Sequence, residues 1–251
     1  MRRYLLPLLG IFLSCGQGVL PSKPVISGSW GTEDGRRLEI YWYSLEGAQR
    51  YELKGIRDSS ARILLNTTDT FAIVSDRFPA YTVVAYAPSD IQESDTLRTS
   101  PLEGSFGLHS YGSGFTSAIC YYTDSTGTTT LIECDPENED VRGQMILLLD
   151  SLHFISPAKD TAKFGTLNIL YVSGPSDMAP LPPTGYADSM AIVAGDTVAS
   201  WMDRGLLGVF DLSDNVARIV VDSLYVGDGS RDSIRVWLSV RYQTIPRLRW
   251  Y

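Results

Sequence analysis

Residues 38–53 read LEIYWYSLEGAQRYEL, and this stretch decides the fold class. Apolar side chains alternate with polar ones at both of its ends, first at Leu38, Ile40 and Trp42 and again at Tyr51 and Leu53. Successive side chains of a β-strand point to opposite faces of the sheet. The period of two therefore predicts two strands, each with one buried face, joined through the glycine-containing turn between them.

The rest of residues 24–100 continues this pattern. Further apolar runs follow at 63–65, 71–74 and 81–86, separated by turn residues and without a long helical period. Short strands at this spacing are typical of an antiparallel β-sandwich. We therefore predict an all-β fold for this part of the chain.

The order of the large aromatic residues resembles that of a fibronectin type III domain. Pro24 lies early, Trp42 and Tyr51 lie in the two predicted strands, and Tyr81 lies in FPAYTVVAYAPSD. The resemblance covers about residues 21–100 and implies an immunoglobulin-like sandwich, with these aromatic side chains in its core rather than in a binding site. The interval from Trp42 to Tyr81 is short for the family, which implies a trimmed strand or loop.

Residues 104–251 predict a second β-sandwich or jelly-roll-like domain of about eight strands. We recognise no family in this part. The apolar run Met145–Ile155 predicts one central strand, whereas Thr197–Leu207 is compatible with a short helix.

The N-terminus predicts export. Arg2 and Arg3 precede an apolar run over residues 4–13, which is too short to span a membrane. Ser14-Cys15-Gly16 then resembles the lipobox of bacterial lipoproteins. This resemblance implies a signal peptide over 1–14, a lipidated Cys15 and a tether over 15–23. It also implies a membrane-anchored protein of the bacterial cell envelope, on the outer membrane, periplasmic or cell-surface side. Phe12 departs from the lipobox, so a plain signal peptide with an incidental cysteine is the alternative.

Cys120 and Cys134 flank a turn in SAICYYTDSTGTTTLIEC. A hairpin centred on Gly127 would place them directly opposite each other, within reach of a disulfide. An exported protein folds where disulfides persist. We predict this disulfide, with two buried thiols as the alternative.

The composition argues against nucleic-acid partners, and the sequence motifs indicate no catalytic or metal site. The formal net charge is −8 and no basic patch is present, so we expect no nucleic-acid partner. We find no motif of a hydrolase, a nucleotide-binding loop or a metal site, and we predict no enzymatic activity, cofactor or metal. The acidic run Asp135–Asp140 predicts a solvated loop, with hard-cation binding as the alternative.

The strand Ile234–Tyr242 carries the candidate binding surface. Its alternation puts five apolar residues on one face, and Arg235, Trp237 and Arg241 on the other. An aromatic side chain flanked by arginines is a frequent composition of interaction hot spots. The alternative is that a loop or a stacked arginine simply covers Trp237.

These features together predict a lipid-anchored, non-catalytic binding or interaction module with a protein or polysaccharide ligand. A carbohydrate-active envelope enzyme with an accessory first domain, and a structural subunit of a surface assembly, are the alternatives.

Overall fold

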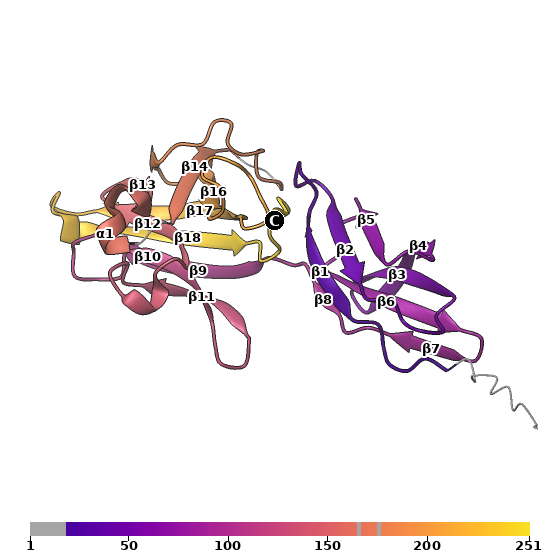
Figure 1. Ribbon diagram of the computed structural model, residues 1–251. Coiled ribbons are helices and arrows are strands. Elements are labelled where there is room, and N and C mark those ends of the chain that lie inside the picture. The colour runs from indigo at the N-terminus through magenta and orange to yellow at the C-terminus, as the bar shows by residue number, and fades with distance from the viewer. Residues whose placement is uncertain (1–18, 165–166, 175–176) are drawn as a thin grey trace, which may run out of the picture.

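The computed structural model describes residues 19–164, 167–174 and 177–251, and the predicted signal peptide and Cys15 lie outside these residues. The chain forms two β-sandwiches that follow each other in sequence and lie side by side (Figure 1). The predicted all-β fold is therefore confirmed. Within the described residues, no helix is both long and apolar enough to cross a membrane.

The first sandwich consists of two antiparallel sheets. One sheet has the order β1-β2-β5, with β1 at Ile26–Gly31, β2 at Leu38–Trp42 and β5 at Phe71–Val74. The other has the order β4-β3-β6-β7, with β4 at Ser60–Thr67, β3 at Arg50–Arg57, β6 at Ala80–Ala87 and β7 at Asp90–Glu93. The short strand β8 at Leu97–Arg98 pairs with the start of β6.

The three aromatic residues Trp42, Tyr51 and Tyr81 pack between the sheets of the first sandwich. Trp42 and Tyr51 are each 3% exposed, and their ring centroids lie 5.7 Å apart. Tyr81 is fully buried, and its hydroxyl donates to the backbone oxygen of Asp76 while accepting from the backbone nitrogen of Phe78. This contact with the backbone a few residues upstream is the tyrosine corner of immunoglobulin-like sandwiches. Burial raises the pKa of Tyr81 to about 12.

The second sandwich consists of two five-stranded sheets. The first has the order β11-β10-β12-β13-β15, with β10 at Ala118–Thr123, β11 at Thr129–Cys134, β12 at Met145–Asp150, β13 at His153–Ile155 and β15 at Ser189–Ala191. The second has the order β14-β16-β17-β18-β9, with β9 at Leu102–His109, β14 at Asn168–Ser173, β16 at Thr197–Asp203, β17 at Asn215–Val226 and β18 at Ile234–Tyr242. Its largest hydrophobic cluster lies between these sheets.

Helical structure in this sandwich is short. Among the described residues it is confined to the single turn α1 at Thr161–Phe164 and to the 3-10 turns η1 at Glu139–Val141, η2 at Pro157–Asp160 and η3 at Arg231–Ser233.

Two local predictions in the second sandwich are wrong. Thr197–Leu207 is not a helix, because β16 pairs with β14 and β17 and is buried on both faces, so its sequence does not alternate. The run Met145–Ile155 is two strands rather than one. Ser151 has a φ of 55° and lies in the tight turn that joins β12 to β13.

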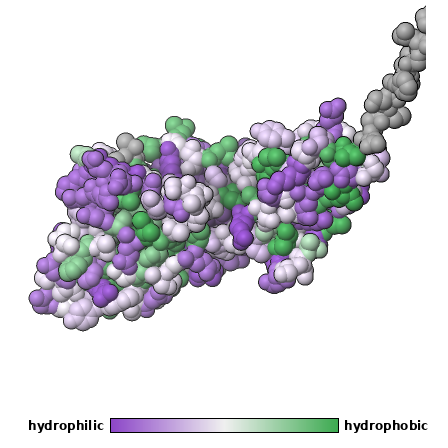
Figure 2. Space-filling view, turned by 90° about the horizontal axis from the view of Figure 1, so that it is seen from below, coloured by the Kyte–Doolittle hydropathy of each residue, from purple (hydrophilic) through white to green (hydrophobic). Residues whose placement is uncertain are grey.

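Residues after β18 return to the first sandwich. Ile245, Leu248 and Trp250 belong to its hydrophobic core, although they lie in the predicted second unit of 104–251. A side chain at Gly31 would overlap the backbone of Arg247, so only glycine allows this close crossing. Figure 2 shows the two sandwiches in contact, with hydrophobic and hydrophilic residues both present at the junction.

Candidate functional site

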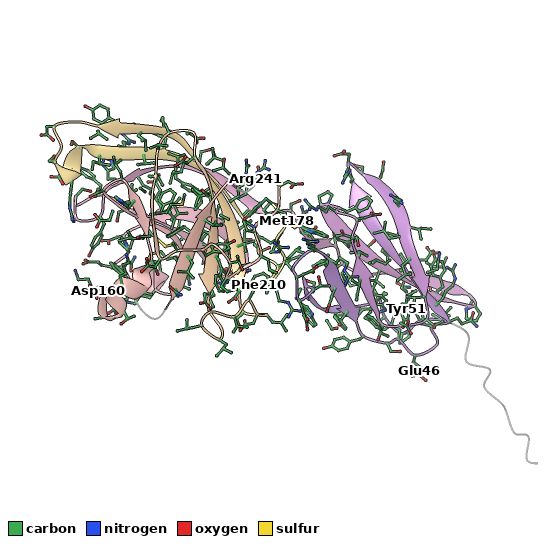
Figure 3. All side chains as sticks on the ribbon, turned by 90° about the horizontal axis from the view of Figure 1, so that it is seen from above. Glu46, Tyr51, Asp160, Met178, Phe210 and Arg241 are labelled. Carbon is green, nitrogen blue, oxygen red and sulfur yellow. A yellow bond between two sulfur atoms is a disulfide. The ribbon has the colours of Figure 1, made fainter. Side chains whose placement is uncertain are left out.

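The candidate site lies on the outer face of the sheet that contains β18, away from the core of the second sandwich. The inward side chains of β18, such as Val236 and Leu238, are buried, and Arg235, Trp237 and Arg241 point outward. Neighbouring strands β17 and β9 complete this face. Figure 3 places Arg241 at the end of β18 that faces the first sandwich.

Trp237 is partly covered by its neighbour. The guanidinium of Arg235 lies 4.8 Å from the centre of the Trp237 ring, and 37% of the tryptophan remains exposed. On β9 the residue opposite Trp237 is Gly107, where a side chain would crowd Arg235. The arginine stacking that we considered as an alternative is thus present, and it leaves more than a third of the tryptophan accessible.

A β-bulge in β17 changes which residues reach this face. The register with β18 shifts between Val221 and Ser223, so that Asp222 is the extra residue. If the side chains of β17 alternated strictly from the turn between β17 and β18, Arg218 would face the core. The extra residue at the bulge reverses this, so Arg218 points outward, directly opposite Arg241. Bulges of this kind are frequent beside functional sites, where they redirect a side chain.

Arg218 and Arg241 differ in their partners. The Nε atom of Arg241 lies 3.0 Å from a carboxylate oxygen of Glu103 on β9. Arg218 makes no hydrogen bond or ion pair with any residue that the structure describes, and its Nε atom is buried. Its strand neighbour on β16 is Ala199, which offers no acceptor. Like charges directly opposite on neighbouring strands destabilise a sheet, so this pair is unusual.

A hollow of about 370 Å³ opens over this pair of arginines. It is lined by Glu103, Gly104, Ser105, Arg218, Val220, Ser239, Val240 and Arg241. The hydroxyl of Ser239 donates a 2.8 Å hydrogen bond to Asp222, the bulged residue. The hollow therefore combines two guanidinium groups with two serine hydroxyls and the Glu103 carboxylate, groups that can bind an anion and the hydroxyls around it.

Cys120 and Cys134 are joined by a disulfide, as predicted, with their Cα atoms 6.2 Å apart. The predicted register is wrong. Cys134 pairs with Ala118 and Cys120 with Ile132, so the cysteines are diagonal neighbours. The turn is centred on residue 126, one residue earlier than predicted, because Asp124 accepts from the backbone nitrogens of residues 126, 127 and 128.

The acidic loop uses its carboxylates within the protein. Glu137 accepts a hydrogen bond from the Tyr111 hydroxyl and lies 3.5 Å from the Lys163 ammonium, and both contacts lower its pKa. Asp135 accepts from the backbone of Glu137. No cluster suited to a metal ion occurs among the described residues.

Sequence reasoning missed an aromatic row on the first sandwich. Trp30, Tyr41 and Phe71 come from β1, β2 and β5, and their ring centroids are 4.7 and 5.8 Å apart at small interplanar angles. Glu39 accepts from the Trp30 indole and the Tyr41 hydroxyl. The alternation that places Ile40 and Trp42 in the core also places Tyr41 outside, and this signal could have found the row.

Comparisons with known proteins add little beyond the fold. No protein-family model matches the chain, and no curated protein is similar to it in sequence. Among solved structures, one described as the crystal structure of FN3tt is similar, with 18% identity and a TM-score of 0.25. The match covers 32% of this chain and 91% of FN3tt. The fibronectin III-like character of the first sandwich therefore rests on its own strand order and aromatic core.

Proposed function

We propose that this protein is a lipid-anchored, non-catalytic binding protein of the bacterial cell envelope. Its recognition surface is the outer face of β18 and its neighbours. The observation that carries this proposal is Arg218, a partly buried arginine that makes no hydrogen bond or ion pair with the described residues, opposite Arg241 and on the same face as the accessible Trp237.

The physical argument concerns groups whose interactions are incomplete. A partly desolvated guanidinium without an acceptor costs free energy that an acceptor would recover. Tryptophan and arginine are also the side chains that most often dominate binding energy. A complementary ligand that covers a face with an accessible tryptophan and an arginine lacking an acceptor therefore binds with a favourable free energy.

The proposed anchor is compatible with this surface. Leu20 packs in the first core, and its backbone nitrogen donates to Asp90 at the start of β7. Figure 1 shows β7 on the side of the first sandwich that lies away from the second. An anchor at Cys15 would thus place the first sandwich next to the membrane and the β18 face farther out.

Photocrosslinking on intact cells tests the proposal. We expect Trp237→Ala to reduce capture of the bound partner or glycan at least tenfold. Tyr43→Ala, which removes an exposed aromatic side chain of the first sandwich, is the matched control and should leave capture unchanged. Equal capture by wild type and Trp237→Ala would reject this surface.

Mass spectrometry of the mature N-terminus tests the anchor separately. We expect a first residue Cys15 that carries acyl chains, since two or more chains hold a protein stably on a membrane. An unmodified Cys15, or a mature protein that begins elsewhere, would reject the anchor and leave the binding surface to be judged by the crosslinking result.

A further inference from the structure

We infer that the hollow over Arg218 and Arg241 binds the carboxylate of an acidic sugar, so that the ligand of the β18 face is a uronate-containing glycan. This inference rests on the proposed binding function and adds the chemical class of the ligand. It starts from the cross-strand pair of arginines and the bulge that creates it.

The two guanidinium groups are placed to share one anion. Their Cα atoms are direct partners across β17 and β18, a separation of about 5 Å. Arg218 has its Nε atom buried, whereas its two terminal nitrogens keep solvent access, and the side chain lines the hollow. A carboxylate accepts two parallel hydrogen bonds from one guanidinium, which is the contact that Arg218 lacks within the described residues.

The charged groups that line the hollow favour a ligand group with a single negative charge. Glu103 is paired with Arg241 and is the one carboxylate among the described residues that line the hollow. Glu103 offsets one of the two arginines, so one net positive charge remains in the hollow, which matches a singly charged carboxylate better than a doubly charged phosphate. The Glu103 carboxylate and the hydroxyls of Ser105 and Ser239 can bind the hydroxyl groups of a sugar.

Trp237 supplies the second contact expected for a glycan. It lies on the same face of β18 as Arg241, four residues away and thus about 13 Å along the strand. Its exposed ring can pack against the apolar face of a sugar. A single sugar cannot reach both points, so the structure assigns an oligosaccharide that runs along β18 with an acidic unit over the arginines.

Isothermal titration calorimetry with the folded protein tests this inference. The probes are a tetramer of galacturonic acid and the same tetramer with all its carboxyl groups methyl-esterified. We expect the acid to bind at least tenfold more tightly than the ester, and this difference to shrink between 50 and 500 mM salt. A hexaglutamate peptide is the third probe, and we expect it to bind more weakly than the acid.

Two variants locate the binding energy. Arg218→Met should weaken binding of the acid about 10- to 100-fold, the range expected for charged hydrogen bonds. It removes no hydrogen bond within the described residues, so the fold should persist, which circular dichroism checks. Arg62→Met, on the first sandwich, is the matched control and should change affinity less than twofold.

Four results would overturn the inference: no binding of the acid at millimolar concentration, equal binding of acid and ester, wild-type affinity in Arg218→Met, or tighter binding of hexaglutamate. Failure of the proposed function is a different result. If Trp237→Ala loses capture on cells while Arg218→Met does not, the binding surface stands and the acidic sugar is rejected. If neither variant changes capture, both are rejected.

Discussion

Arg50 in the first sandwich and Arg218 in the second both lie on the outer face of a sheet, yet their surroundings differ. Arg50 contacts Glu52 at 2.6 Å and Asn66 at 2.9 Å, and its guanidinium lies 3.7 Å from the centre of the Tyr86 ring. Arg218 has no such partner within the described part of the chain. One face satisfies its own polar groups, whereas the other leaves a guanidinium group without an acceptor among the described residues.

The largest expected effect tests whether the two sandwiches can be compared as separate units. Leu248 is fully buried in the first core, although it follows the last strand of the second sandwich. We expect Leu248→Ala to lower the free energy of unfolding of the first sandwich by about 2–5 kcal/mol. Urea denaturation measures it. Leu207→Ala, at an exposed leucine, should change it by less than about 0.5 kcal/mol. Equal stability of Leu248→Ala and wild type would contradict this packing.

The disulfide should act on the second sandwich alone. It closes a short loop, so replacing Cys120 and Cys134 together by alanine should lower the free energy of unfolding by about 3 kcal/mol at most. Hydrogen exchange followed by mass spectrometry should show faster exchange in β10, β11 and β12, with β3 and β6 unchanged. Faster exchange in both sandwiches would show that they unfold as one unit.

The network around Arg50 should contribute stability that depends on pH. The hydrogen bond from Tyr86, followed by the contacts with Arg50, lowers the pKa of Glu52 below its ordinary value of 4.5. A carboxyl group with a lowered pKa in the folded state stabilises the protein above the unfolded pKa, and this is lost as the pH falls through the folded pKa.

We therefore expect Glu52→Gln to cost about 1–2 kcal/mol at pH 7 and progressively less below about pH 4.5. Thermal unfolding from pH 7 down to pH 3 measures it. Glu46→Gln, at an exposed position, is the control and should cost less than about 0.5 kcal/mol at every pH. A cost of Glu52→Gln that stays constant over this range would argue against the network.

The smallest effect sharpens the comparison itself. Arg218→Met removes a like-charge neighbour of Arg241 and breaks no hydrogen bond within the described residues, so we expect stability to stay within about 0.5 kcal/mol of wild type or to rise. Arg50→Met should lower stability more than Arg218→Met does in the same assay, because it leaves Glu52 without its ion pair. Equal losses in the two variants would remove the distinction between the faces.

Much of the architecture could be predicted because it depends on local patterns. The alternation in residues 38–53 identified β2 and β3, and the aromatic order identified the sandwich and its core. The strand at Ile234–Tyr242 was predicted with the correct faces for the same reason. The two cysteines could be paired because only one short turn separates them.

The remaining features depend on register, which the local pattern does not contain. The disulfide is diagonal because the turn starts one residue earlier than the position of Gly127 suggested. Arg218 faces outward only because the bulge at Asp222 adds a residue to β17. Strand β16 resembled a helix because burial on both faces removed its alternation. The sequence therefore predicted part of the candidate site, including Trp237 and Arg241, but not Arg218.

The return of Ile245, Leu248 and Trp250 to the first core has a consequence for synthesis. A ribosome finishes the strands of the first sandwich about 150 residues before it adds these side chains, so the nascent sandwich lacks part of its core for that time. Contacts between such distant residues slow folding, because a long loop must close before they form. We therefore expect the first sandwich to fold early but to reach full stability last, and a chain stalled before residue 245 to remain susceptible to proteases and chaperones.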